Sequence, residues 1–181
     1  MLVINGRFLK HTMNSNYTIV SGTNRTGSNT LKIAQQYKDL LAQKGIEANL
    51  LSLENLDVST RNEQIRELET SLLIPTTKFI FISPEYNGSI PGVLKSLFDS
   101  SDIQSCWWGK KALLVGVSTG RAGNLRGMEH LTGILHYLKM MVHHNKLPIS
   151  VVNVLLHLDG SIKDEPTLKA IHQQLDEFIA F

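Results

Sequence analysis

Short apolar runs alternate with amphipathic segments along most of the chain. Residues 17–20 have the β-branched and aromatic bias of a buried strand. Residues 78–83 are nearly all apolar and show no alternation, which indicates a strand covered on both faces, as in a parallel sheet. The apolar runs predict strands at residues 17–20, 48–52, 78–83, 111–117 and 149–156.

The segments between these runs carry apolar residues at intervals of three or four, which is the spacing of an amphipathic helix. Gly45 stands where the cap of the first helix belongs, and Pro91 begins another helix at its favoured first position. A long helix is predicted at residues 124 to about 141. Because parallel neighbours need helical crossovers, the pattern predicts an α/β fold, a doubly wound five-stranded parallel sheet with helices on both faces.

The loop after the first predicted strand is suited to a phosphate group. Gly22 and Gly27 bracket hydroxyls, an amide and the guanidinium of Arg25, and a helix follows directly. Amides at a helix start and a forked guanidinium both bind phosphate oxygens. The lysine of an NTPase loop is missing, and so is the dinucleotide fingerprint Gly-x-Gly-x-x-Gly. A single terminal phosphate fits best, and the alternative is a turn that merely caps the helix.

Ligands of doubly wound sheets bind outside the carboxyl ends of the strands, so the loops at residues 83–95 and 116–126 are further candidates. Both are rich in glycine and polar groups, and the first places Tyr86 where a flat ring could lie against it. The three loops together resemble the NADPH-dependent FMN reductase family, which has a flavodoxin-like fold. The family pattern Gly-Ser-x-Arg-x-Gly-Ser is met at residues 22–28, with threonine in place of the first serine. The second signature, Pro-Glu-Tyr-Asn followed by Gly-Ser-Ile-Pro, is met without exception at residues 84–91.

The resemblance implies an FMN-binding oxidoreductase and assigns residues to three parts of the flavin. The phosphate would be held by Thr23, Arg25, Ser28, Asn29 and Thr30. The isoalloxazine would be lined by Pro84, Glu85, Tyr86 and Asn87. The other polar edge of the ring would be closed off by Ser118, Thr119, Gly120 and Arg121. Arg121 is also a candidate for contacting a second substrate, such as an NADPH phosphate, and the alternative is a solvated loop arginine.

Flavin N5 accepts hydride directly, so no catalytic side chain is assigned. The expected activity passes electrons from NADPH or NADH, through FMN, to a small acceptor such as a quinone, an azo compound, a metal oxyanion or free flavin. The alternative is a flavodoxin-like FMN-binding electron carrier or regulator without turnover. Flavodoxins in the strict sense are usually very acidic, whereas this chain has a net charge of +2. The resemblance also suggests a homodimer or homotetramer, with Tyr86 near the neighbouring subunit.

Composition limits the partners. The apolar fraction of 42% in 181 residues is that of a soluble globular protein, expected here as one domain at residues 17–181 after a disordered lead-in at residues 1–16. The small net charge and the lack of a basic stripe give no reason to expect nucleic acid, and no apolar run is long enough for a membrane span.

The single cysteine, Cys106, excludes an internal disulfide and agrees with a reducing, cytoplasmic compartment. Beside Trp107 and Trp108, it is expected to be a buried, inert thiol.

Two other kinds of site compete with this interpretation. Residues 116–120 spell Gly-x-Ser-x-Gly, the nucleophile-elbow pattern of serine hydrolases, with Asp159 and His172 later in the chain. An elbow needs a helix to start at once after the serine, whereas the following glycines predict a loop. Seven histidines, including the adjacent His143 and His144, suggest a metal site. The sequence has no ligand spacing that is typical of such a site, so no bound metal is expected.

Overall fold

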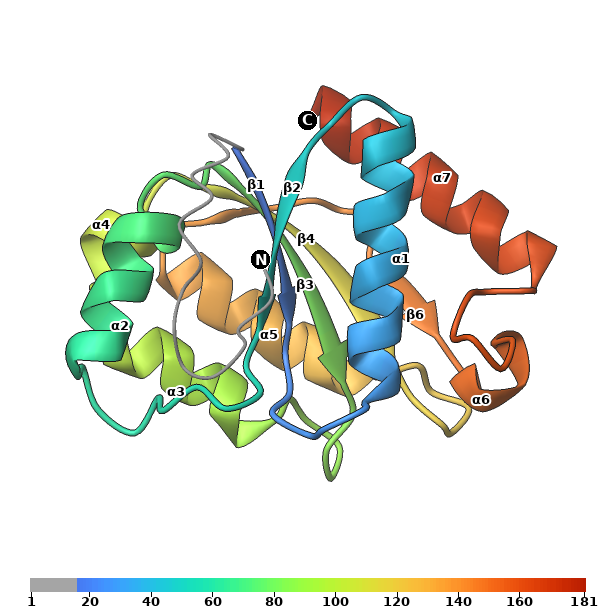
Figure 1. Ribbon diagram of the computed structural model, residues 1–181, viewed down its shortest axis with the longest axis horizontal. Coiled ribbons are helices and arrows are strands. Elements are labelled where there is room, and N and C mark those ends of the chain that lie inside the picture. The colour runs from blue at the N-terminus through green and yellow to red at the C-terminus, as the bar shows by residue number, and fades with distance from the viewer. Residues whose placement is uncertain (1–15) are drawn as a thin grey trace.

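The computed structural model describes residues 16–181, which form an α/β fold with the sheet in the middle (Figure 1). The predicted lead-in, residues 1–16, lies outside the described residues except for Asn16. The carbonyl oxygen of Asn16 accepts hydrogen bonds from the amides of Thr77 and Lys78, so the described part of the chain begins beside the start of β3. Within the described part of the chain, no helix combines the length and the apolar content needed to cross a bilayer.

All the strands run parallel, in the order β2-β1-β3-β4-β5, and β6 also pairs with β4. This is the flavodoxin-like doubly wound order, and it confirms the predicted fold class. The three central strands are almost fully buried, as their unbroken apolar sequences predict. The strands are β1 (Tyr17–Ser21), β2 (Ala48–Ser52), β3 (Lys78–Pro84), β4 (Lys111–Val117), β5 (Met141–Val142) and β6 (Leu147–Ile149).

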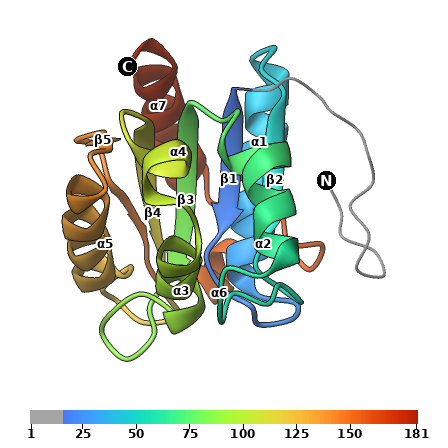
Figure 2. The same ribbon diagram turned by 90° about the vertical axis from the view of Figure 1, so that its left-hand side faces the viewer.

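Helices cover both faces of the sheet (Figure 2), and the sheet separates two hydrophobic clusters. One face packs against α1 and α7, and the other packs against α2, α3, α4 and α5. The helices are α1 (Asn29–Gln43), α2 (Glu63–Leu68), α3 (Gly92–Ser100), α4 (Ile103–Trp107), α5 (Leu125–Tyr137), α6 (Val152–Leu155) and α7 (Glu165–Ala180), with a π-helical turn, η1 (Glu69–Leu73), directly after α2.

The fifth predicted strand, at residues 149–156, is wrong in its bounds. The edge of the sheet is built from two short strands, β5 against the start of β4 and β6 against its end. After Ile149 the chain leaves the sheet, because Val151 takes a left-handed conformation with φ 45°. The amides of Val151 and Val152 bond to the carbonyls of Gly120 and Ser118, so the apolar run continues as α6 and not as a strand.

Helix boundaries differ from the prediction where local caps intervene. The helix expected to reach about residue 141 ends at Tyr137, since Lys139 has φ 55° and the amide of Met140 bonds back to the carbonyl of Leu135. This arrangement is a left-handed helix cap. Pro91 is the residue before α3 rather than its first residue. The short helix α4 was not predicted, because it is too brief to show a period.

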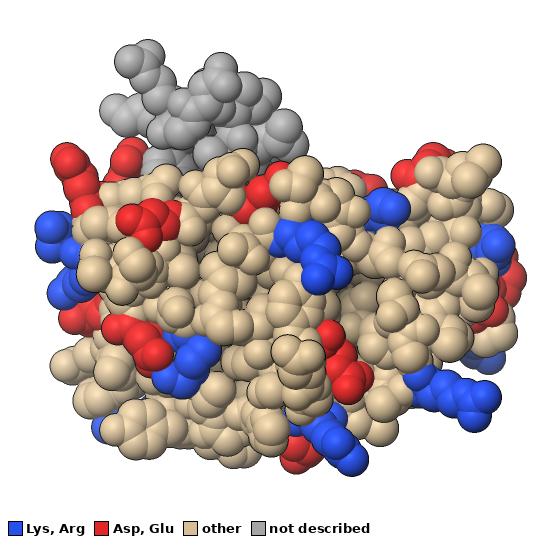
Figure 3. Space-filling model, turned by 90° about the horizontal axis from the view of Figure 1, so that it is seen from below, with Lys and Arg blue, Asp and Glu red and all other residues tan. Residues whose placement is uncertain are grey.

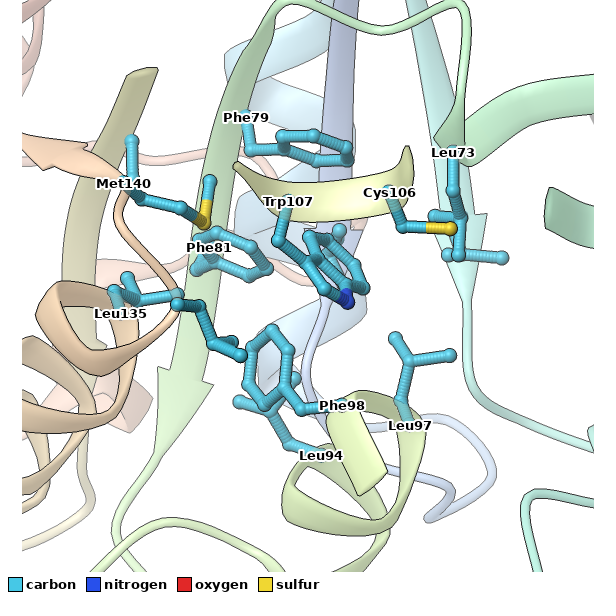
Figure 4. Packing of buried hydrophobic residues seen from close by; sticks show 14 of the residues in the cluster. Leu73, Phe79, Phe81, Leu94, Leu97, Phe98, Cys106, Trp107, Leu135 and Met140 are labelled. Atoms are coloured by element: carbon cyan, nitrogen blue, oxygen red, sulfur yellow. The ribbon is translucent and has the colours of Figure 1, made fainter. Parts of the chain in front are cut away.

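An aromatic cluster fills the space between the sheet and helices α3 and α4 (Figure 4). The ring of Trp107 is fully buried, with its centroid 5.1 Å from that of Phe79 and 5.0 Å from that of Phe98. Its indole N–H donates to Ser101 Oγ at 2.9 Å, so the polar edge of the ring is satisfied. Trp107 is thus buried with its polar atom paired, whereas Trp108 is 39% exposed.

Cys106 lies in the same cluster with its side chain buried, as the sequence predicts. Burial, with a smaller contribution from Glu69, raises the pKa of the Cys106 thiol to about 12. At pH 8 the thiolate fraction is therefore on the order of 10⁻⁴, and the thiolate is the form that reacts with alkylating agents.

We expect native protein at pH 8 to resist alkylation by iodoacetamide, because the thiol of Cys106 is both protonated and inaccessible. The same protein in guanidinium chloride should take up one label per chain, since the sequence has a single cysteine. Intact mass measures both results. Labelling of the native protein at the rate of the unfolded one would contradict the packing of this cluster.

Candidate functional site

Three loops at the carboxyl ends of β1, β3 and β4 enclose a cavity of about 120 Å³. It brings together most of the residues assigned by resemblance, although they are distant in the sequence. The lining residues are Thr23, Arg25, Ser28, Asn29, Thr30, Pro84, Glu85, Tyr86, Val117, Ser118, Thr119 and Val152. Asn87, Gly120 and Arg121 do not line it.

The first loop connects β1 directly to the start of α1. Ser28 caps this helix, because its Oγ accepts the amide of Leu31 at 3.1 Å. The first-turn amides of Asn29 and Thr30 precede any helical carbonyl that they could bond to, so the helix start offers donors toward the cavity. Gly22 permits the loop to pass close to β3, since a Cβ there would lie 3.0 Å from the carbonyl oxygen of Ile82.

The second loop carries a tight hairpin that presents Tyr86. Tyr86 and Ser89 exchange two backbone hydrogen bonds, and the residues between them, Asn87 and Gly88, have φ of 52° and 76°. Asn-Gly with positive φ at both positions is the signature of a type I′ turn. Asn87 therefore has a backbone role at the tip of the hairpin, and this is why it lies away from the cavity.

The hairpin and the first loop are joined by Tyr86. Its phenolic oxygen and Thr23 Oγ1 share a hydrogen bond of 2.8 Å, and the guanidinium of Arg25 lies 5.1 Å from the centre of its ring. The Thr23 hydroxyl also accepts the amide of Arg25 at 3.3 Å. Tyr86 thus closes one side of the cavity and holds the exposed arginine next to the helix start.

Asn124 holds the second and third loops together, and the sequence analysis missed it. It is fully buried, with φ 64°, and its Nδ2 donates to the carbonyl oxygens of Ser83 at 2.9 Å and Pro84 at 3.0 Å. A Cβ on Gly127 would lie 2.0 Å from Asn124 Oδ1, so the next helical turn must contain glycine. The only signal in the sequence is an asparagine after Gly123 at the start of a helix. The same pattern is typical of an ordinary helix N-cap, so it does not predict that Asn124 clamps two loops together.

The third loop is a compact turn and not a nucleophile elbow. Ser118 Oγ donates to the carbonyl of Gly120 at 2.8 Å and accepts the amide of Gly123 at 3.0 Å, so the hydroxyl belongs to the loop's own hydrogen bonds. The next helix begins only at Leu125. Gly116 is explained by packing, because a Cβ there would lie 2.0 Å from the carbonyl oxygen of Gly123. The hydrolase alternative is therefore rejected.

A fourth wall comes from α6, where the sequence predicts a strand. Val152 lines the cavity, and Asn153 Oδ1 accepts a hydrogen bond of 2.7 Å from Nδ2 of Asn29. This contact ties the far side of the site to the first turn of α1. Val151 has positive φ and forms the turn that places Val152 at the cavity. This conformation is rare for a β-branched residue, so no local sequence pattern predicts it.

The face that contains the carboxyl ends of the strands carries basic and acidic side chains interspersed among uncharged ones (Figure 3). Arg25 and Arg121 are exposed there, and Glu85 is half-buried. The attraction for an anion at the cavity therefore comes from local donors, which are the guanidinium of Arg25 and the start of α1, and not from an extended basic surface.

The comparisons with known proteins agree with this geometry. Residues 16–152 match the model of the family described as NADPH-dependent FMN reductase. A 2-hydroxy-1,4-benzoquinone reductase from Burkholderia sp. is 31% identical over 106 residues, which are 56% of this chain and 58% of that protein. The chain thus spans less than two thirds of that relative.

Two further proteins extend the likeness. A quinone reductase from Pseudomonas putida is 30% identical over 138 residues, which are 67% of this chain and 70% of that protein. The structure of FerB, a flavoenzyme NAD(P)H:(acceptor) oxidoreductase from Paracoccus denitrificans, superposes with a TM-score of 0.71 at 24% identity, covering 91% of this chain and 94% of that one. The family model matches most of this chain, and the three loops of the chain converge on one cavity. The chain therefore belongs to the NADPH-dependent FMN reductase family.

Proposed function

We propose that this chain is an FMN-dependent oxidoreductase that takes hydride from NADPH or NADH and passes the electrons to a small acceptor. The observation that carries the proposal is the cavity in which the start of α1, Arg25 and the Tyr86 hairpin meet, in a chain of the FMN reductase family. Residues 17–181 act as one flavin-binding domain in this proposal. Together with the single cysteine, the reducing chemistry favours a cytoplasmic location.

The residues at the start of α1 fit the phosphate of FMN. A phosphate monoester needs several donors and positive charge, and the first-turn amides, the Thr23 hydroxyl and the exposed guanidinium of Arg25 supply both. Asn29 and Thr30 lie in the same turn and line the same cavity. Hydrogen bonds to a charged group contribute about 1.5–3 kcal/mol each, so these donors account for a large part of the flavin affinity.

The cavity accommodates a phosphate but is too small for a whole flavin in its present form. Its volume of about 120 Å³ is below the roughly 300 Å³ at which ligand pockets begin. The remainder of a bound flavin would lie outside this cavity, beside Tyr86, whose half-buried ring bridges the first and second loops. The turn beneath it is anchored by two backbone hydrogen bonds, so the position of Tyr86 is set by the hairpin.

For electron transfer the protein has to position the flavin and its substrates, and no side chain has to transfer a proton. A bound flavin supplies the redox chemistry, accepting hydride at N5 and passing electrons on. Asn124 fixes the carbonyls of Ser83 and Pro84, and thereby the wall on which a flat ring would rest. Thr119 lines the cavity and is exposed, and Arg121, two residues further along the same loop, is exposed as well, so a second substrate would enter on this side. The relatives named as quinone reductases favour a quinone as the acceptor.

The proposal predicts that the purified chain retains FMN after excess flavin has been removed, and that NADPH or NADH bleaches the flavin absorbance anaerobically. Addition of 1,4-benzoquinone should restore the oxidised spectrum. Retained flavin that neither nucleotide reduces would favour the alternative, an electron carrier or regulator. Failure to retain flavin would contradict the proposed cofactor site.

Arg25→Ala should weaken FMN binding by about tenfold, the effect of losing one charge-assisted contact to phosphate, and leave riboflavin binding unchanged. Fluorescence quenching of the two flavins measures both affinities. The control is Arg66→Ala, which removes an equally exposed arginine from α2, far from the cavity. An equal loss for FMN and riboflavin would remove Arg25 from the phosphate site.

We also propose that the chain forms a homodimer or homotetramer, as the family resemblance suggests. An apolar groove of about 690 Å³ between α3 and α5 begins at Ser89 and Ile90, directly beside the Tyr86 hairpin, and a second copy would cover it. Tyr137 borders this groove with 82% of its surface exposed, so Tyr137→Glu should not disturb the fold. Light scattering should show a dimer or larger species for the wild type and a monomer for the variant; an unchanged mass would exclude this surface.

A further inference from the structure

Two neighbouring histidines meet the last helix at the end of the sheet opposite the flavin cavity. His143 follows β5, and its amide donates to the carbonyl of Ala112 near the start of β4. The cavity lies beyond Val117, the last residue of β4. At about 3.3 Å per residue the two ends of the strand are roughly 20 Å apart, so this cluster is separate from the proposed flavin site.

One potential ligand atom from each of His143, His144 and Glu177 lies within 4.8 Å of the other two. The imidazole rings of the two histidines are 4.4 Å apart between centroids. Glu177 comes from the last turns of α7, and the sequence gives no hint that it meets the histidines. Two imidazoles and a carboxylate, with a fourth position open to water, form a known type of zinc-binding set.

The surroundings hold these groups in place. Asn145 donates from its side chain to one oxygen of Glu177 at 2.7 Å, and Gln173 donates to the other oxygen at 2.9 Å. The carbonyl of Asn145 accepts a 2.8 Å hydrogen bond from the buried Gln174, so the loop is tied to α7. Each carboxylate oxygen keeps a lone pair for a metal ion. Such supporting hydrogen bonds orient ligands and strengthen metal affinity.

One side of the cluster is apolar and the other is open. His143 is buried, with its ring 5.1 Å from that of Phe181 and 6.0 Å from that of Phe178. His144 is exposed and Glu177 half-buried, so an ion can enter from solvent. The nearby Lys146 pairs with Glu129 at 2.7 Å and does not compete for the carboxylate of Glu177.

We propose that His143, His144 and Glu177 form a site for a divalent transition metal ion of the zinc type. In a tetrahedral zinc site two nitrogens at 2.0–2.1 Å from the ion are about 3.3 Å apart, so the ligand atoms need to close by roughly 1.5 Å at most. The exposed side chain of His144 is free to make that movement. Nδ1 of His143 accepts the amide of Asn145 at a long 3.3 Å, a weak bond that a metal can replace.

Ligand type sets the preference among metals. Imidazole nitrogen suits zinc, nickel and copper, whereas magnesium and calcium prefer oxygen ligands. A bound ion would link β5 to α7 and stabilise the docking of the last helix. The activity proposed above does not depend on it, because the cluster and the cavity lie at opposite ends of β4.

Isothermal titration of the full, tag-free chain with zinc chloride tests the proposal, with magnesium chloride as the control ion. The wild type should bind one zinc ion per chain and no magnesium. His144→Ala and Glu177→Gln should each weaken zinc binding by at least about 10- to 100-fold, because losing a ligand costs more than losing a group that only supports a ligand, and the latter already costs that much. His136→Ala, which removes an exposed histidine from α5, is the matched control and should bind zinc like the wild type.

Both ligand substitutions are at side chains that are not fully buried, so the variants are expected to fold, and circular dichroism without metal checks this. Zinc should raise the melting temperature of the wild type and of His136→Ala, and not that of His144→Ala. Absence of zinc binding by the wild type would overturn the proposal. It would equally be overturned if both ligand variants bound zinc as tightly as the wild type, because the ion would then lie elsewhere.

Discussion

The parallel pairing of β1, β3 and β4 is the constraint on which the rest of the structure depends. Tyr17 pairs with Lys78, and Lys78 pairs with Lys111, so the three strands start level and their carboxyl ends meet at one edge. Each strand is buried on both faces, so polar loops lie at the two ends of the strands, and the three loops of the site share the carboxyl end. The cavity exists because three loops, separated by long stretches of sequence, are delivered to the same place.

Within this sheet, close packing of the backbone around the third loop determines how that loop sits beside the end of β3. Gly116, Gly123 and Gly127 all face atoms that a Cβ would overlap, and Asn124 uses the space between them to hold the carbonyls of the neighbouring loop. Small residues thus permit a buried polar clamp, which ties the start of α5 to the end of β3 through the carbonyls of Ser83 and Pro84. None of these three glycines lines the cavity, so their role is in the close packing around the third loop.

The two ends of the sheet carry different chemistry. The carboxyl end presents helix-start amides, hydroxyls and Arg25, a set of donors suited to an anion. The amino end presents His143, His144 and Glu177, a set of lone pairs suited to a cation. The separation is a consequence of the parallel topology, in which the starts of helices gather at one edge and their ends at the other.

Much of the fold follows from local sequence. The unbroken apolar run at residues 78–83 requires a strand covered on both faces, and the repeated alternation of strands and helices leaves few topologies besides a doubly wound sheet. The candidate loops after the strands were also accessible, because glycines and polar residues mark them in the sequence. Gly27, for example, has φ 65°, a conformation that glycine adopts without strain. The family resemblance supplied the assignment of these loops to a flavin.

The tertiary structure decided what local patterns cannot encode. Residues 149–156 look like a strand, but the carbonyls of the third loop capture the amides of Val151 and Val152 and turn the chain into α6. The local sequence around Asn124 predicts only the start of a helix. Its role as a clamp depends on the carbonyls of Ser83 and Pro84, about 40 residues earlier in the chain. The sequence by itself determined most of the elements, their order and the chemistry of the loops, because those depend on short-range periodicity and on backbone preference. The contacts between distant segments were decided by packing.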